Sequence, residues 1–481
     1  MAFNSNESDE KKMKKRVIHW FRNDLRLFDN PALHKASSFD EVIPIYILTP
    51  DIILGVGKAS RIWLHHSLYK LNESTGFKLA FYKGNPIEVL TGIIQAEKIQ
   101  GVFWNRIYEP YHLANDVDLI AKLKKMGISC ESFNSSLLWE PSSILKKDET
   151  PYKVFTPFYR KGCLFSESPR EPLILGKSIN WKSCNGKLQL EDLRLLPNHD
   201  WKNKIESHWN MGELAANERL EEFVENGIMH YKTGRNYPSK SYVSRLSPHI
   251  HFGELSPNQI WHRVRSLGQN KNIDHFCSEL GWREFSYYLI HHFPEMLSKN
   301  LNRSFDSFPW ENNEDFIRSW KLGQTGYPIV DAGMKELWET GYIHNRVRMI
   351  VGSFLVKNLL SHWKYGRDWF NDCLVDADLA NNTAGWQWVA GSGADAAPYF
   401  RIFNPVKQGQ DFDADGEYTK KYLPQLSLMP KKYLFNPWEA PNDILHDADI
   451  KLGYNYPYPI VDLKASRERA IFAFGQIKKN V

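Results

Sequence analysis

The fold can be worked out from "RVIHWFRNDLRLFDNPALHKASSFDEVIPIYIL", residues 16–48, because two short apolar runs frame this stretch. These runs, 16–21 and 41–48, are rich in β-branched and aromatic residues, a composition typical of buried strands. Runs of the same kind follow at "KLAFYKG" (78–84), "GVFWNR" (101–106) and "ISCESFN" (128–134). A strand is predicted at each of these runs.

Segments with helical periodicity separate the predicted strands. They are "RIWLHHSLYKLNEST" (61–75), "PIEVLTGIIQAEKI" (86–99) and "DVDLIAKLKKMG" (116–127). Strand and helix in alternation predict a doubly wound, Rossmann-like parallel sheet, so residues 16–134 are expected to form an N-terminal α/β domain. Such folds bind ligands beyond the carboxyl ends of their strands. No G-x-G-x-x-G or P-loop motif follows any strand, so neither of the usual nucleotide sites is indicated.

The chain changes character after the α/β pattern. Residues 135–210 lose periodicity and gather Pro, Ser, Asn and Lys, which predicts a linker that, apart from "PYKVFTPFYR" (151–160), runs mostly across a surface. From 211 to 475 the segments carry apolar residues at helical spacing, for example "HFCSELGWREFSYYLIHHF" (275–293) and "NRVRMIVGSFLVKNLLSHW" (345–363). Ser256, followed by proline, is expected to cap a helix. The second half is therefore predicted to be an all-helical domain.

Composition and charge fit a folded globular protein. The chain has 481 residues, of which 42% are apolar and 24% charged, and 14% are aromatic, an excess compatible with a planar cofactor. The first sixteen residues hold five basic and three acidic residues, so they supply +2 of the net charge of +5 and leave +3. Global charge is thus a weak argument for nucleic acid, and a local basic groove is needed instead. Residues 1–15 are predicted to be a disordered tail.

Cysteine usage and hydropathy indicate a protein of a reducing compartment that does not span a membrane. The five cysteines are scattered and include no C-x-x-C pair, which disfavours both a disulfide framework and a zinc site. No run of about eighteen apolar residues could span a bilayer, and the N-terminus lacks the apolar core of a secretory signal. We therefore expect a cytoplasmic protein, nucleoid-associated if bacterial, with no metal and no membrane partner.

Two polar clusters lie on helices that are otherwise apolar. In "SELGWREF" (278–285), Glu279 and Trp282 are three residues apart and share a face, with Arg283 beside them. In "HNRVRM", Asn345 and Met349 are four apart, and Arg348 adjoins both. A buried carboxylate or amide needs a hydrogen-bond partner, so these residues indicate either a ligand site or ordinary core and cap positions.

Two further clusters follow different patterns. In "DADLANNTAGWQW", Asp376, Asp378, Asn382 and Trp386 are expected along neighbouring helical rows, whereas Trp388 points elsewhere because it is two residues from Trp386. The loop "TGRNYPSKSYVSRLS" (233–247) is basic and rich in hydroxyls, as phosphate-binding loops are. An Arg348–Asp376 ion pair of purely structural role is an equal alternative for those two residues.

Together these clusters identify a resemblance. The motifs "TGYPIVDAGM" (325–334), "HNRVRMIVGSFLVK" (344–357) and "DLANNTAGWQW" (378–388), with "VIHWFRNDLRLFDNPAL" (17–33), resemble the photolyase/cryptochrome family. The chain is most similar to the class I enzymes that repair cyclobutane pyrimidine dimers (CPDs). The resemblance implies an N-terminal antenna domain, a linker, and a helical domain that holds FAD in a folded conformation.

The resemblance also implies which residues hold FAD. These residues would be Tyr231, Ser244, Arg245, Leu246, Ser247, Arg283, Arg348, Asp376, Asp378 and Asn382. Asn382 would face the flavin N5 position, where an amide can accept or donate a hydrogen bond. The sequence departs from the family at Val243, where a threonine is usual, so one phosphate contact is expected to be missing.

The implied activity is light-driven repair of UV-damaged DNA, a carbon–carbon lyase reaction by a monomer. An electron from excited FADH⁻ would split a pyrimidine dimer that is flipped out of the duplex, because the dimer is inaccessible inside the base stack. The catalytic set would be Glu279, Trp282, Asn345, Met349, Asn382 and Trp388. Burial beside Trp282 would favour a protonated Glu279, which could stabilise charge on a pyrimidine carbonyl.

Three further roles follow from the resemblance. Trp386, Trp363 and Trp310 would relay electrons from near the solvent to the flavin. Arg235, Arg346 and Arg401 would grip DNA phosphates at the rim without reading sequence. "WNRIYEPYH" (104–112) lies where antennas contact this family, with Glu109 as a ligand; a folate (MTHF) is the first expectation and a deazaflavin the alternative.

Three other functions remain as alternatives. A cryptochrome would keep the flavin without repair, but plant-type members tend to have Asp at the position of Asn382. Enzymes for (6-4) photoproducts have a second histidine where this chain has Asn345. A light-independent flavin enzyme would need a pyridine-nucleotide motif, and the sequence contains none.

Overall fold

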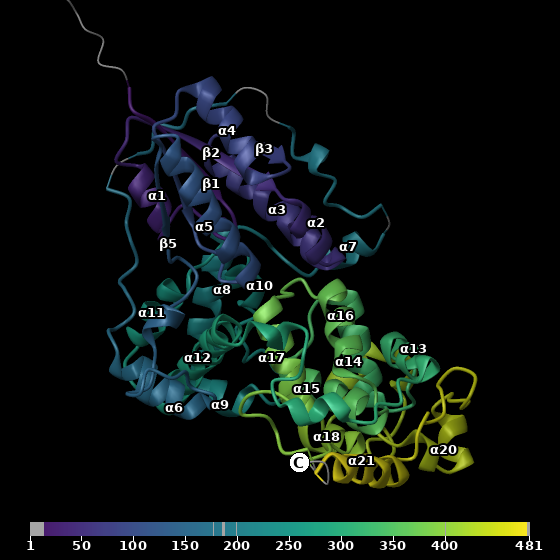
Figure 1. Ribbon diagram of the computed structural model, residues 1–481. Coiled ribbons are helices and arrows are strands. Elements are labelled where there is room, and N and C mark those ends of the chain that lie inside the picture. The colour runs from purple at the N-terminus through teal and green to yellow at the C-terminus, as the bar shows by residue number, and fades with distance from the viewer. Residues whose placement is uncertain (1–13, 177, 185–187, 199, 400, 479–481) are drawn as a thin grey trace, which may run out of the picture.

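Figure 1 shows an α/β layer joined to a larger helical part. The computed structural model describes residues 14–478 except 177, 185–187, 199 and 400. The predicted tail, residues 1–15, therefore lies almost wholly outside the described residues.

The α/β part contains one parallel sheet. Its strands are β1 (Arg16–Phe21), β2 (Glu41–Leu48), β3 (Ala80–Lys83), β4 (Gly101–Asn105) and β5 (Ser129–Phe133). They are ordered β3-β2-β1-β4-β5 and every neighbouring pair is parallel. All eight residues of β2 are buried, as expected for a parallel strand covered on both faces. The doubly wound sheet predicted from the sequence is confirmed.

Helices connect the strands. They are α1 (Pro31–Ala36), α2 (Pro50–Gly55), α3 (Lys58–Ser74), α4 (Pro86–Glu97) and α5 (Pro110–Lys125). Local sequence explains two of the starts: Asn30 and Asn85 each precede a proline, and each side chain accepts a backbone N–H of the first turn. The helices α3, α4 and α5 occupy the three segments predicted to be helical.

The connection to the helical part is not only a surface crossing. It contains α6 (Phe155–Pro157), α7 (Trp201–Glu206) and short 3₁₀ and π turns. The Asn180 carbonyl accepts a main-chain hydrogen bond from Val42 beside the sheet. Phe155 and Phe158, however, are buried in the core of the helical part. This stretch lies within "PYKVFTPFYR" (151–160), and its aromatic residues supply core area to the helical part.

The rest of the described chain contains no named β-strand. Its helices are α8 (Glu213–Asn226), α9 (Tyr231–Gly234), α10 (Ser247–His251), α11 (Pro257–Arg265), α12 (Lys271–His292), α13 (Glu314–Leu322), α14 (Pro328–Thr340), α15 (Asn345–Ser353), α16 (Trp363–Cys373), α17 (Leu379–Ala390), α18 (Pro405–Phe412), α19 (Glu417–Tyr422), α20 (Asn442–Asp447) and α21 (Leu463–Lys478). The predicted start at Ser256 is confirmed by a capping box with Gln259. None of these helices, within the described ranges, is long and apolar enough to cross a membrane.

One predicted helix is broken. The periodic segment 345–363 forms α15, then a π-helical turn at Phe354–Asn358, and α16 begins only at Trp363. Leu360 adopts a left-handed conformation with φ of 49°, and the His362 side chain caps the next helix. Periodicity continues across this break because both sides bury apolar residues, so the pattern could not reveal it.

Buried contacts between the two parts fix their arrangement. Trp63 of α3 packs against Trp209 and donates from its indole N–H to Glu254 at 3.1 Å. Arg26, almost fully buried, donates to the carbonyl of Gly253 at 2.8 Å. These bonds hold the carboxyl ends of the strands against the helical part.

Candidate active site

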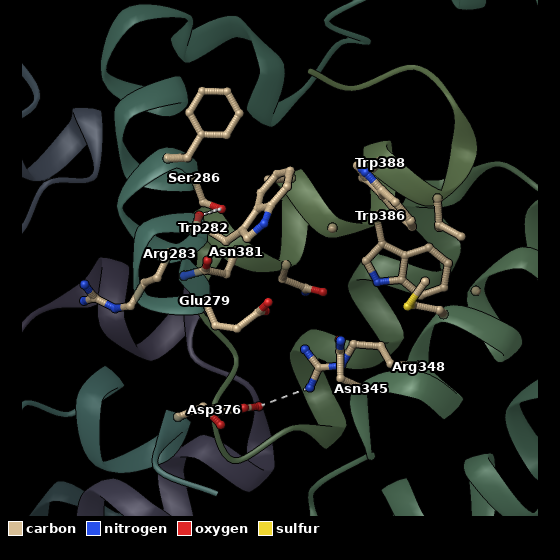
Figure 2. A pocket seen from close by; sticks show the side chains of 18 of the residues that line it. Glu279, Trp282, Arg283, Ser286, Asn345, Arg348, Asp376, Asn381, Trp386 and Trp388 are labelled. Carbon is tan, nitrogen blue, oxygen red and sulfur yellow. Dashed lines mark hydrogen bonds and ion pairs between the residues drawn. The ribbon is translucent and has the colours of Figure 1, made fainter. Parts of the chain in front are cut away.

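A cavity of about 520 Å³ lies among α12, α15 and α17. Figure 2 shows side chains from all three helices pointing into it. Its lining includes twelve of the residues singled out from the sequence: Arg235, Ser247, Glu279, Trp282, Arg283, Asn345, Arg348, Met349, Asp376, Asn382, Trp386 and Trp388. The structure therefore brings most of the predicted site together.

Helix α12 supplies one wall. Asn270 caps it by accepting the backbone N–H groups of Asn272 and Ile273. Glu279, Trp282 and Ser286 follow at intervals of three and four residues and all line the cavity. The helix thus presents one polar and aromatic row to the cavity while its other side is buried.

Helix α15 supplies a second wall with Asn345, Arg348 and Met349. His344 caps this helix, and its ring nitrogen accepts the backbone N–H of Arg346 at 3.3 Å. Burial lowers the pKa of His344 to about 3, which keeps the ring neutral and able to accept that bond. The cap places Asn345 at the first helical position, beside the cavity.

Helix α17 supplies the third wall, and both of its tryptophans reach the cavity. Trp386 is the more buried: its ring packs 5.0 Å from Phe370 and 6.1 Å from Trp320. Gly366 of α16 makes room for it, since a Cβ there would lie 2.0 Å from the indole. The surroundings of Trp386 and Trp388 thus differ, since Trp386 is buried and Trp388 is partly exposed, although both line one cavity.

Glu279 has a partner that the sequence did not indicate. Arg235 forms a two-bond ion pair with this carboxylate, the longer bond being 3.0 Å. The pair stabilises the charged carboxylate, which argues against the expected protonated Glu279. It also places Arg235 in the cavity wall, half-buried, rather than free on the rim to grip DNA.

Arg348 and Asp376 approach each other at 3.7 Å, as drawn in Figure 2. Neither Arg348 Nε nor Asp376 Oδ1, both buried, has a hydrogen-bond partner among the described residues. Orphaned buried polar atoms need a ligand or solvent to satisfy them. This wall therefore has unused hydrogen-bonding capacity.

Asp378 does not line the cavity, contrary to expectation. It is the N-cap of α17, accepting the Asn381 N–H at 2.7 Å, and it also accepts from the Tyr287 hydroxyl. Burial alone would raise its pKa, but the bond and charge of His251 and the charge of Arg283 hold the pKa well below its usual range. Because α17 begins only at Leu379, Asp376 and Asp378 are not on helical rows with Asn382.

Asn382 lines the cavity and is nearly buried. Its amide nitrogen donates to the carbonyl of Arg367 at 3.0 Å. That bond orients the side chain and leaves its oxygen to accept a hydrogen bond from a ligand.

The predicted phosphate loop reaches the cavity through Arg235 and Ser247. Tyr231 and Leu246 are buried in the core instead. Arg245 has a φ of 53° and lies over the ring of Tyr342, a cavity residue, at 5.0 Å. Ser244 accepts the Leu246 N–H at 3.4 Å. Tyr231, Ser244, Arg245 and Leu246 are not among the residues that line the cavity.

The three tryptophans of the predicted relay lie in different settings. Trp363 is fully buried and donates to Asn300 at 2.9 Å, and Trp310 is partly exposed. The His362 ring contacts both, at 5.4 Å from Trp363 and 5.2 Å from Trp310. The aromatic neighbours of Trp386 include Trp320, which no sequence pattern distinguished from core.

Two more arginines carry charge near Arg235 of the cavity wall. Arg346 is half-buried, donating to Asn236 and lying 4.3 Å over the Phe412 ring. Burial, and then the charges of Arg235 and Arg401, lower the pKa of Arg346. Arg401 is exposed. The charges of these three arginines therefore act on one another, and of the three only Arg401 is exposed.

A second cavity, of about 290 Å³, lies at the carboxyl ends of the strands. Tyr111 and His112 line it, but Glu109 does not, contrary to the expected antenna contact. Glu109 lies beside this cavity, 3.9 Å from the Nε2 atom of His112 in its lining, and also near the helical part. Burial and the Asp378 charge raise the pKa of Glu109 to about 7, and the His251 charge opposes them. No group of three metal-binding side chains is found in the part of the chain that the structure describes.

Comparison with known families agrees with this architecture. The protein thus joins a sheet domain to a helical domain that contains this cavity. Residues 17–173 match the family described as DNA photolyase, and residues 276–476 match the FAD binding domain of DNA photolyase. The chain belongs to the photolyase/cryptochrome family.

The relatives include both photolyases and cryptochromes. The chain is 45% identical to a deoxyribodipyrimidine photo-lyase of Agrobacterium fabrum, over 96% of this chain and 98% of the relative. It is 35% identical to cryptochrome-2 of Arabidopsis thaliana, over 97% of this chain and 80% of the relative. A bacterial class III photolyase from Agrobacterium tumefaciens superimposes with a TM-score of 0.93 at 44% identity, covering 99% and 100% of the two chains.

These matches correct one expectation. The class I assignment is not supported, because the structural relative with a TM-score of 0.93 is a class III photolyase. Several of the motifs behind the class I assignment contribute to the cavity among α12, α15 and α17. Classes that need the same side chains around such a cavity share these motifs, so the motifs could not separate one class from another.

Proposed function

We propose that this protein splits cyclobutane pyrimidine dimers in DNA in a light-dependent lyase reaction. The observation that carries the proposal is the meeting of Trp282, Asn345 and Trp388 from three helices around one cavity that also has arginines in its lining. A flipped pyrimidine pair needs flat apolar walls and hydrogen bonds to its edges, and this cavity offers both.

The cavity also fits FAD. The orphaned atoms of Arg348 and Asp376 and the free oxygen of Asn382 match the mixed donor and acceptor edge of an isoalloxazine. Ser247 and Arg283, which also line the cavity, would contact FAD directly. The other residues expected to hold FAD would position these contacts without lining the cavity: Tyr231, Ser244, Arg245, Leu246 and Asp378. When bound and reduced, FAD supplies the light-excited electron that drives dimer splitting.

The chain's own residues bind and orient the lesion. Trp282 and Trp388 provide stacking surfaces, and Met349 lines the same cavity. Asn345 can donate to a pyrimidine carbonyl and accept from its N–H through one amide. The Arg235–Glu279 pair presents charged hydrogen-bonding groups close by. Arg346 and Arg401 would hold phosphates and so position the duplex.

Two further roles are part of the proposal. Trp386, Trp363 and Trp310 would carry electrons for re-reduction of the cofactor, with the His362 ring between the outer two. A second chromophore, a folate or a deazaflavin, would bind the α/β domain near the cavity of about 290 Å³. An absorption spectrum of the purified protein checks the second role, since each chromophore class adds its own band; flavin bands alone would contradict it.

Blue-light reception without repair is a second candidate. It is favoured by the cryptochrome relative, which is 35% identical over 97% of this chain. The two candidates share the flavin cavity and differ in whether bound DNA is repaired.

The decisive experiment is a repair assay. The reduced holoprotein is mixed with an oligonucleotide containing one thymine dimer, and restored thymines are counted after blue light and after darkness. Restoration in light only supports the proposal. A parallel substrate with a (6-4) photoproduct should stay unrepaired, and Trp388→Ala should lower the yield on the dimer. No restoration in either condition favours the photoreceptor.

A further inference from the structure

Three aromatic rings form a parallel stack that ends at the cavity. Phe155 lies 3.9 Å from Trp282 with an angle of 11° between the rings. Tyr159 lies 5.5 Å from Phe155 at 8°. The rings of Tyr159 and Phe155 come from the connection between the two domains, whereas Trp282 belongs to α12.

Only the last ring of this stack touches the cavity. Trp282 lines it, and neither Phe155 nor Tyr159 does. Phe155 covers one face of the indole, so the remaining surface of Trp282 is what a ligand in the cavity can meet. The Trp282 side chain has only two torsions, and Phe155 covers one face of its ring. It has therefore lost most of its conformational freedom before a ligand binds.

Two further contacts hold Tyr159 and Phe155 in place. Gly281, next to Trp282, makes room for Tyr159, because a Cβ there would lie 2.5 Å from the tyrosine ring. The backbone N–H of Phe155 donates to Asp395 at 3.2 Å, in the loop that follows α17 and its Trp388. The two indole-bearing elements are therefore tied to one segment.

We propose that Phe155 is a positioning residue for lesion recognition: it holds the Trp282 indole in the orientation that receives a flipped pyrimidine pair. This inference rests on the proposed repair function. The connection between the two domains would then take part in substrate discrimination. A phenylalanine that only filled the core would have no such effect.

The test compares two phenylalanines of the same segment. Phe155→Leu keeps an apolar side chain but removes the flat ring, and Phe158→Leu does the same at a buried residue that packs on Phe285 and Tyr288 rather than on Trp282. For each holoprotein, the Kd for a thymine-dimer duplex and for the undamaged duplex is measured in darkness, together with repair per absorbed photon at saturating protein.

Phe155→Leu should lose preference for damaged DNA by roughly three- to ten-fold, the scale of one aromatic stacking contact, while repair per photon of bound dimer is unchanged. Phe158→Leu should keep the wild-type preference, and Phe155→Tyr, which retains the ring, should restore it. If Phe155→Leu does not fold, Gly281→Ala displaces Tyr159 instead and should give the same loss.

Two results would overturn the inference. One is a folded Phe155→Leu or Gly281→Ala protein with wild-type preference; the other is an equal loss in Phe158→Leu. A wild-type protein that repairs no dimers and shows no preference removes the proposed function, and this inference with it, so the two failures are distinguishable.

Discussion

Arg346 illustrates how a side chain can serve both the protein and a ligand. Its guanidinium donates to Asn236 and covers the Phe412 ring, and Arg235 and Arg401 add positive charge around it. Like charges held together cost free energy in the absence of an anion, and a DNA phosphate would relieve that cost.

Arg346→Ala should therefore weaken binding to damaged and undamaged duplexes by similar factors. The slope of log Kd against log salt should fall by about 1, because one phosphate contact is lost. Binding titrations at several salt concentrations measure both effects. Arg219→Ala, in a surface ion pair of α8, is the matched control and should change neither. A loss confined to damaged DNA would show that Arg346 contacts the lesion instead.

Among elements, the α16–α17 pair determines where Trp386 lies. The indole occupies the space that a side chain at Gly366 would need. Small residues at a helix contact allow close approach, and the cavity wall depends on that approach.

Gly366→Ala should lower the free energy of unfolding by about 1–3 kcal/mol, because the added methyl overpacks a buried ring and outweighs the better helix propensity of alanine. Chemical denaturation measures the change. Gly92→Ala in α4 is the control: a Cβ there meets no atom within 4 Å, so alanine should stabilise that helix by about 0.5–1 kcal/mol. Equal stability of Gly366→Ala and wild type would mean that the ring can move aside.

Over the molecule as a whole, the interface between the two domains contains Glu109. Burial and the Asp378 charge raise its pKa to about 7 in the folded protein. The folded state then binds a proton that the unfolded state has released, so this group's contribution to stability is lost as the pH rises from about 4.5 to about 7.

The substitution Glu109→Gln removes this titrating group, and with it the decrease in stability as the pH rises. Its stability relative to the wild type should rise between pH 5 and pH 8 by on the order of 1–3 kcal/mol. Thermal melting of both proteins across this range measures the difference. Glu131→Gln, at an exposed position, should show no such trend. A constant difference between Glu109→Gln and wild type would contradict the assigned surroundings of Glu109.

Much of the fold and the membership of the cavity could be predicted because local patterns encode them. The continuous apolar runs predicted β1 and β2, since a parallel strand buried on both faces has no polar side. Helical spacing put Glu279 and Trp282 on one face. The break before Trp363 was invisible because apolar periodicity runs through it.

The parallel sheet, the helical second half and most of the residues that meet at the cavity follow from the order of amino acids alone, since strand alternation, helix caps and helical spacing are properties of neighbouring residues. The pairing of those residues emerges only in the folded chain: Arg235 with Glu279 across 44 positions, Phe155 against Trp282, and Asp378 turned from the cavity to cap α17. Such pairings depend on the desolvation and packing of groups far apart in the chain, and no local pattern records them.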